Sequence, residues 1–359
     1  MTTRRGFLAG LMAAGLAPRI SWADAGSPAY VSAARLSDGS YALIGLSEQA
    51  EALFQISLPA RGHAAATHPS QPYVVAFARR PGTFAMVINC ISGLAEVQLD
   101  APAGRHFCGH GAFSADGALL FTSENDFDAV RGMVGVWDVA SGYRRIDEFA
   151  TGGIGPHELR LMPDGETLVI ANGGIETHPD SGRTKLNIPT MEPSLSYVST
   201  AGRFLEKVTL PTAMHKNSIR HLTLRADGTV AFAMQWQGAD LAPPLLALHR
   251  RGTDPRLLSA PPEQHRQMSG YAGSVAMTRD GTLVAITSPR GGMLQVFDVD
   301  RGYYIGAMAR GDICGVGPAA HGFAATTGMG DVIEVNDVRP AWSRRLPVQW
   351  DNHLVAVRA

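Results

Sequence analysis

Short apolar stretches alternate with polar turn sequences along nearly the whole chain, at lengths typical of β-strands. One pattern recurs four times: an apolar strand, a turn ending in Asp-Gly, and a second apolar strand, with the turn glycines at Gly117, Gly165, Gly228 and Gly281. Glycine supplies the positive φ angle that such tight turns require. Scarcely any apolar stretch has the 3.6-residue period and the caps of a helix, so the pattern predicts an all-β protein.

The repeat extends to four strands in units of roughly 45–60 residues, which is the signature of propeller blades. Six such units are predicted near residues 63–104, 110–150, 157–210, 221–259, 274–310 and 316–347. Residues 29–60 supply three more strands without an innermost one, and the C-terminal tail from Trp350 has the pattern of a lone first strand. Pairing the two completes a seventh blade and leaves no sheet edge open between the ends. The chain is therefore expected to be a seven-bladed β-propeller closed by its C-terminal strand.

Histidine recurs at one place in this repeat, seven or eight residues before the turn glycine or at the matching point of another unit. The five histidines at that place are His63, His110, His157, His221 and His353. Only 12 of the 359 residues are histidine, so this register is hard to ascribe to chance. Since the first strand of each blade lines the central tunnel, the register predicts a ring of imidazoles around one mouth of that tunnel.

Such a ring predicts a transition-metal site, with iron or copper as the suspected ion, because neutral imidazole binds these metals well. The alternative is a structural ring in which each histidine ties one blade to the next by a hydrogen bond. The cysteines Cys90, Cys108 and Cys314 are expected to be buried free thiols, although a ligand role for Cys108 or Cys314 stays open.

Polar side chains gather on the same face, from the ends of second strands and from a long insertion at residues 173–194. An insertion of this length in a compact chain is typical of a lid or binding loop. We expect three carboxylates near the ring to serve as further ligands or to orient the imidazoles, namely those of Glu124, Asp126 and Glu158. The full set predicted to bind a ligand on this face is Glu124, Asn125, Asp126, Glu158, Asn172, His178, Asp180 and Arg220.

The first 25 residues have the pattern of an export signal. Arg4 and Arg5 precede Phe7 and a short apolar stretch, and small residues follow before an expected cleavage site near residue 25. Paired arginines are typical of the twin-arginine route, which predicts a periplasmic protein with a propeller over residues 26–359. Past residue 20, no apolar run approaches the roughly 20 residues that span a bilayer. A net charge of −1 excludes a broad basic surface for nucleic acid.

Seven short motifs carry a resemblance to a known family, at residues 109–114, 123–126, 155–158, 171–175, 177–180, 218–221 and 350–353. They resemble the DUF1513 family of twin-arginine-exported bacterial proteins, over nearly the whole mature length. The resemblance implies a periplasmic propeller that accompanies imelysin-type, iron-regulated proteins, and so it favours iron. It assigns no catalytic residues to the chain.

Three functions remain open at this point. The first is a metal-binding propeller that serves metal acquisition or handling. The second is a metal-dependent enzyme, either redox or lactonase-like, although calcium sites of the lactonase kind prefer oxygen ligands over the nitrogen donors found here. The third is a scaffold that uses its polar face to dock a periplasmic partner. The histidine register favours the first.

Overall fold

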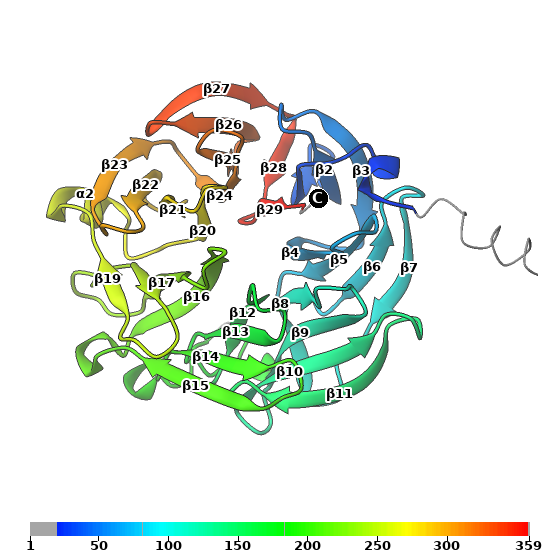
Figure 1. Ribbon diagram of the computed structural model, residues 1–359, viewed down its shortest axis with the longest axis horizontal. Coiled ribbons are helices and arrows are strands. Elements are labelled where there is room, and N and C mark those ends of the chain that lie inside the picture. The colour runs from blue at the N-terminus through cyan, green and yellow to red at the C-terminus, as the bar shows by residue number, and fades with distance from the viewer. Residues whose placement is uncertain (1–19, 81, 183, 358–359) are drawn as a thin grey trace, which may run out of the picture.

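Seven antiparallel sheets surround a central axis in the computed structural model, which describes residues 20–80, 82–182 and 184–357 (Figure 1). The prediction of a seven-bladed, all-β propeller is confirmed. Most of the expected export signal, residues 1–19, lies outside the described residues, and its cleavage near residue 25 stays a prediction. Within the part of the chain that is described, no helix is long and apolar enough to cross a membrane.

Six blades are each built from four consecutive strands, as the repeat predicts. Blade 2 comprises β4 (Gly62–Thr67), β5 (Tyr73–Ala78), β6 (Ala85–Asn89) and β7 (Leu94–Leu99). Blade 3 comprises β8 (Arg105–Phe113), β9 (Leu119–Asp126), β10 (Arg131–Asp138) and β11 (Arg144–Ala150). Blade 4 comprises β12 (Pro156–Leu161), β13 (Thr167–Asn172), β14 (Ser194–Ser199) and β15 (Phe204–Thr209). Blade 5 comprises β16 (Asn217–Leu224), β17 (Val230–Trp236), β18 (Leu246–His249) and β19 (Arg256–Leu258). Blade 6 comprises β20 (Ser274–Met277), β21 (Leu283–Ser288), β22 (Met293–Asp298) and β23 (Tyr304–Ala309). Blade 7 comprises β24 (Ile313–Pro318), β25 (Phe323–Thr327), β26 (Asp331–Asn336) and β27 (Arg339–Arg345).

Blade 1 joins the two ends of the described chain. Its outer strands are β1 (Tyr30–Leu36), β2 (Tyr41–Leu46) and β3 (Ala52–Leu58), and its innermost positions are filled by β28 (Val348–Trp350) and β29 (Val355–Ala356). Both short strands pair antiparallel with β1, on the side away from β2. The predicted closure by the C-terminal tail is therefore confirmed, and the ring has no open edge at this junction.

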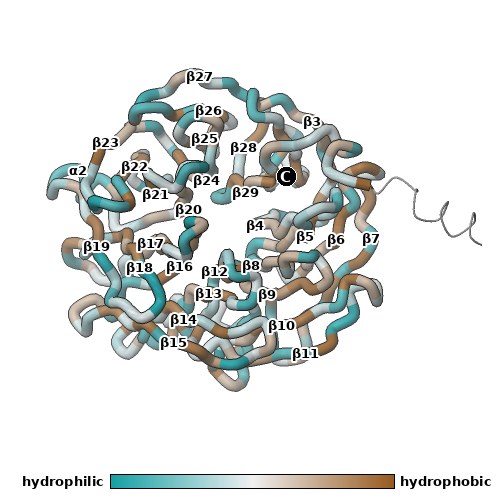
Figure 2. The backbone as a smooth tube through the Cα atoms, in the orientation of Figure 1, coloured by the Kyte–Doolittle hydropathy of each residue, from teal (hydrophilic) through white to brown (hydrophobic). Residues whose placement is uncertain are grey.

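Apolar side chains pack between neighbouring blades and hold the ring together. The middle strands are almost wholly buried, as in β13 and β21, whereas the outermost strands alternate or face water, as in β11 and β27. Figure 2 shows this difference along the chain, with hydrophilic segments at the inner ends of several blades around the axis. The four Asp-Gly turn glycines have φ angles between 70° and 86°, so each occupies the left-handed region that the turn requires.

The helical segments of the described residues are short: η1 (Trp22–Ala25) precedes β1, and the others connect strands, namely η2 (Pro179–Ser181), η3 (Ile188–Thr190), η4 (Thr212–Met214) and α2 (Pro262–Gln267). Two of them, η2 and η3, lie in the insertion that connects β13 to β14. Trp22 of η1 is buried against blades 1 and 2, and its indole Nε1 donates to the His68 carbonyl oxygen at 2.9 Å.

Candidate metal centre

Five imidazoles from five blades meet on the propeller axis. Eight of their ten possible ring pairs have centroids 4.6–5.8 Å apart. His157 is partly buried, and the other four are buried. These rings form what we call the histidine cluster: His63, His110, His157, His221 and His353.

Irregular pairing of the innermost strands places these rings. The register of β4 with β5 shifts between Gly62 and Ala65, and similar shifts occur beside the histidines of β8, β12 and β16. Such a bulge re-aims a side chain without ending the strand. In the C-terminal tail the interruption is complete, because His353 lies between β28 and β29.

Gly109 leaves the space that the His63 ring occupies. Its φ is +95°, and a Cβ at this position would come within 2.5 Å of His63 Cδ2. Replacing Gly109 with alanine should therefore push His63 out of the cluster and strain the backbone of β8. We expect weaker metal binding and a loss of about 1–3 kcal/mol in the free energy of unfolding. Denaturant titration and metal titration of the variant measure both; Gly142→Ala, at a left-handed glycine with open space around it, is the control that separates strain from displacement of His63.

Several ring nitrogens of the cluster are buried without any hydrogen-bond partner. They are Nδ1 of His63, Nε2 of His110, Nδ1 of His157 and Nε2 of His353. A buried polar atom left unpaired costs about 1–3 kcal/mol. A bound ion or ordered water could satisfy these four atoms together.

Two buried carboxylates lie near ring nitrogens of the cluster, and one of them, Glu158, is within hydrogen-bonding distance of a ring. Glu158 Oε2 lies 3.3 Å from His221 Nδ1 and 3.9 Å from His110 Nδ1, and Arg160 Nε donates to its other oxygen at 2.7 Å. Because a carboxylate accepts, His221 carries its proton on Nδ1 and keeps the lone pair on Nε2. On the opposite side, Asp351 Oδ1 lies 3.6 Å from His63 Nδ1.

Arginines keep both carboxylates ionised. Burial alone would raise the pKa of Glu158, but the charge of Arg160 and the nearby imidazoles hold that pKa well below its usual value. For Asp351 burial is likewise outweighed by His63, Arg79 and Arg61, which lower its pKa. Arg61 Nε and Arg79 Nη1 donate to Asp351 at 2.6 and 2.9 Å. Asp351 belongs to one of the sequence motifs, but the sequence alone did not place it beside His63, because Arg61 and Arg79, which bind it, lie far away in the chain.

The cluster histidines are neutral at ordinary pH. Burial is the largest cause and lowers the pKa of all five, while neighbouring imidazoles and arginines lower it further for His110, His157 and His353. Neutral imidazole is the form that binds a metal ion.

The cluster lies between two cavities. One cavity, about 270 Å³, is reached by His63, His157 and His221. The other, about 340 Å³, is lined by His110 and His353 and by residues further along the inner strands, such as Glu158. The rings therefore separate the two cavities, and the inner-strand bulges place them there.

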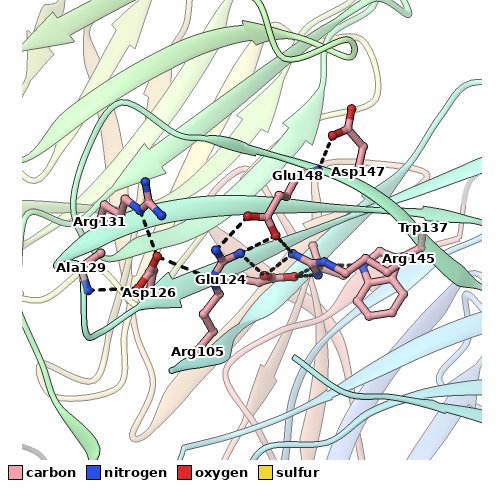
Figure 3. A network of polar contacts seen from close by, with 10 residues as sticks. Arg105, Glu124, Asp126, Ala129, Arg131, Trp137, Arg145, Asp147 and Glu148 are labelled. Carbon is pink, nitrogen blue, oxygen red and sulfur yellow. Dashed lines mark hydrogen bonds and ion pairs between the residues drawn. The ribbon is translucent and has the colours of Figure 1, made fainter. Parts of the chain in front are cut away.

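Glu124 and Asp126 do not reach the histidines, contrary to the expectation that they would orient the imidazoles. Glu124 is fully buried and accepts two hydrogen bonds from Arg145, at 2.6 and 2.9 Å (Figure 3). Asp126 accepts from Arg131 at 2.9 Å and lies 3.6 Å from Arg105. Both belong to an ion-pair network that ties together the strands of blade 3.

The remaining predicted ligand residues are divided between a cavity and the blades. Asn125 and Arg220 line the 270 Å³ cavity, and Asn125 donates to the Thr177 carbonyl oxygen at 3.2 Å. Asn172 is buried inside blade 4, where its amide donates to Ser194 and Ser196 across β13 and β14. His178 accepts from the backbone of Asp180 at 3.3 Å and packs on Phe127, and Asp180 is exposed. These last three make no contact with the cluster among the described residues.

The thiols are free, as expected, and none is close enough to the histidines to join a set of candidate ligands among the described residues. Burial raises the pKa of Cys108 and of Cys314 to about 12, so both stay protonated. Cys314 takes the place of a histidine in blade 7. The next residue, Gly315, allows the tail to approach, because a Cβ there would lie 2.8 Å from the Leu354 nitrogen.

The fold and the site define a closed seven-bladed β-propeller with a buried histidine cluster on its axis. The chain belongs to the DUF1513 family, described as a protein of unknown function, whose model matches residues 56–357. No curated protein matches the sequence.

Among solved structures, the chain is similar to a structure titled hydrazine synthase of Kuenenia stuttgartiensis. The TM-score is 0.59 at 15% sequence identity, and the match covers 86% of this chain and 89% of that one. At this identity the likeness shows the propeller fold alone.

Proposed function

We propose that this protein is a periplasmic metal-binding propeller whose histidine cluster holds a transition-metal ion, iron or copper, for acquisition or handling of that metal. One observation carries the proposal: ring nitrogens from separate blades converge in a buried site and lack hydrogen-bond partners. A bound ion would satisfy the nitrogens together.

Two overlapping sets of histidines have suitable spacing. The candidate ligand atoms lie within 4.8 Å of one another in each set; the sets are His63, His110 and His157, and His110, His221 and His353. Two imidazole nitrogens bound to one ion at about 2.1 Å each are at most about 4.2 Å apart. A small inward shift of the rings would therefore seat an ion. His110 belongs to both sets, which makes it the most important single ligand.

The donor set favours a borderline metal over a hard one. Neutral imidazoles suit iron, copper, zinc and nickel, whereas calcium and magnesium prefer oxygen ligands. Glu158 and Asp351 would act as partners that fix the ring orientation and raise the basicity of the imidazoles. When bound, the ion would supply a redox-active or Lewis-acidic centre in the tunnel.

A purely structural ring fits less well. In such a ring each histidine would bond to a neighbouring blade, yet only His221 of the five has a hydrogen bond from its ring among the described residues. Ordered water is the competing occupant, since it also satisfies buried polar atoms.

Elemental analysis of the protein purified from the periplasm tests the proposal. We expect about one equivalent of iron or copper per chain, retained through dialysis and restored after chelation and reconstitution. Less than about a tenth of an equivalent of any transition metal, before and after reconstitution, would contradict it.

The cellular part of the proposal is supported by Arg4 and Arg5, which mark the twin-arginine route, and by the family resemblance. We infer that the protein works in the periplasm beside imelysin-type proteins in iron handling. Pull-down of such a partner from a periplasmic extract, with and without iron, tests this role; recovery of the full-length chain from the cytoplasm alone would contradict it.

A metal-dependent enzyme is the second candidate, and one observation favours it. The 270 Å³ cavity reaches three histidines of the cluster, so a small molecule would have access to a bound ion. An activity screen of the reconstituted protein against lactones and peroxides separates catalysis from storage or transfer.

A further inference from the structure

The 270 Å³ cavity at the histidine cluster is lined by cations and by no carboxylate among the described residues. We call it the basic cavity; its charged lining residues are Arg79, Arg80, Lys185 and Arg220. Its volume is just below the roughly 300–1,000 Å³ typical of ligand pockets, which fits a small molecule. A net-neutral protein that concentrates positive charge in one enclosed place attracts anions there.

Arg220 is the central cation of this cavity. The register shift in β16 falls on Arg220 itself and aims its side chain away from the regular ladder. No described carboxylate forms an ion pair with its guanidinium, and its buried Nε has no hydrogen-bond partner. Arg79 differs, because Asp351 neutralises it at 2.9 Å. Arg220 is partly buried, with its Nε fully so, and desolvating a guanidinium without a counter-ion costs free energy that an anionic ligand would offset.

Lys185 brings a second positive charge from the insertion. Thr177 of the same insertion accepts a hydrogen bond from Arg80 at 2.8 Å, and Lys185 Nζ contacts Gln237 of blade 5, so the insertion spans the cavity. Burial and the charges of Arg220 and Arg290 lower the pKa of Lys185. Neighbouring positive charges repel one another, and the negative charge of a bound anion would relieve that repulsion.

Neutral donors complete the lining. Asn125, Gln235, Tyr271 and Asn352 face the same cavity, and the Arg290 guanidinium stacks 4.4 Å from the Tyr271 ring centroid. Asn125 and Gln235 already donate to the Thr177 and Ala272 carbonyl oxygens, so the oxygens of a ligand would be bound mainly by the cations. His63, His157 and His221 border the cavity on the side of the cluster.

We propose that the basic cavity binds a small oxyanion ligand, carrying carboxylate or phosphate groups, between Arg220 and Lys185 and in contact with the histidine cluster. The inference deepens the proposed function, because such an anion would reach a metal held by the cluster. The anion site is nevertheless built from residues other than the metal ligands, so it can be tested without metal.

The test is calorimetric titration of the metal-free protein at low ionic strength with citrate, with inorganic phosphate, and with glycerol as an uncharged probe. We expect one citrate or phosphate per chain and no binding of glycerol. Arg220→Gln and Lys185→Gln should each weaken anion binding about tenfold or more. Arg144→Gln, which removes an exposed charge on β11, is the matched control and should leave binding unchanged.

Preference for phosphate or for citrate identifies which oxyanion chemistry the site takes. Absence of binding by either anion, or equal binding by wild type and both cavity variants, would overturn the proposal. Because Lys185 is exposed at the rim, its variant should fold even if Arg220→Gln does not. His110→Asn should keep anion binding in the metal-free state while losing metal, so failure of the anion site and failure of the metal site give different results.

Discussion

His110→Asn is expected to lower the affinity of the chain for the proposed transition metal by about 100-fold or more. His110 is the one histidine shared by both candidate ligand sets, and its Nε2 is buried without a partner. Asparagine keeps a polar side chain of smaller volume but does not provide the imidazole lone pair. Competition with a chelator of known affinity, followed by elemental analysis, measures the change.

A matched control comes from a buried histidine outside the cluster. His265 in α2 hydrogen-bonds through Nε2 to the Ala242 carbonyl oxygen at 2.9 Å. His265→Asn should therefore reduce stability without changing the metal content. Metal retention by His110→Asn at the wild-type level would show that the cluster does not hold the ion.

The metal-free protein is expected to lose stability steeply as the pH falls below about 6.5. Burial depresses the pKa of all five cluster histidines in the folded state, whereas the unfolded chain has the ordinary value of 6.5. Below pH 6.5 the unfolded state therefore binds more protons than the folded state, and protons favour unfolding. Above that pH both states are neutral at these sites, and the effect vanishes.

The size of the effect follows from the number of imidazoles. Each histidine that is protonated only in the unfolded state contributes about 1.4 kcal/mol per pH unit, so five give a slope of at most about 7 kcal/mol per unit. Glu158 and Asp351, whose pKa values are lowered, add to the loss only near and below their unfolded pKa values. Melting temperatures measured between pH 8 and pH 5 therefore report the histidines, because the two carboxylates contribute only at lower pH.

Three described histidines outside the cluster, His68, His106 and His249, also have a pKa lowered mainly by burial. The contribution of the cluster is therefore isolated by comparing the wild type with a His63→Asn/His157→Asn variant. That variant should show a shallower acid slope. A wild-type melting temperature that stays level from pH 7.5 to pH 5.5 would contradict the account of five neutral, buried imidazoles.

The blades and their closure could be predicted because they depend on local signals. Gly117 and its three counterparts mark turns that only a positive φ permits, and apolar strands on both sides fix the hairpins. Residues 29–60 lack an innermost strand, and the tail from Trp350 has the pattern of one, so the two segments could be paired into a seventh blade. Histidines at one register position were predicted to lie around a common axis, because equivalent strand positions share an orientation.

The depth and the partners of the cluster could not be read from the chain. Bulges beside His63 and His110 turn the rings inward, and no sequence pattern marked these bulges. Asp351 meets Arg79 across 272 residues, which local spacing cannot show. Glu124 was expected near the ring because it ends a second strand, but Arg145 on β11 of the same blade holds it.

The central claim is that one transition-metal ion is bound among the five imidazoles. An anomalous-difference map tests it most directly, recorded on a crystal of the purified protein above and below the absorption edge of the metal found by elemental analysis. The account predicts one strong peak on the propeller axis within about 2–2.3 Å of ring nitrogens that include His110. An axis that carries only water, with any metal peak at the surface, would contradict it.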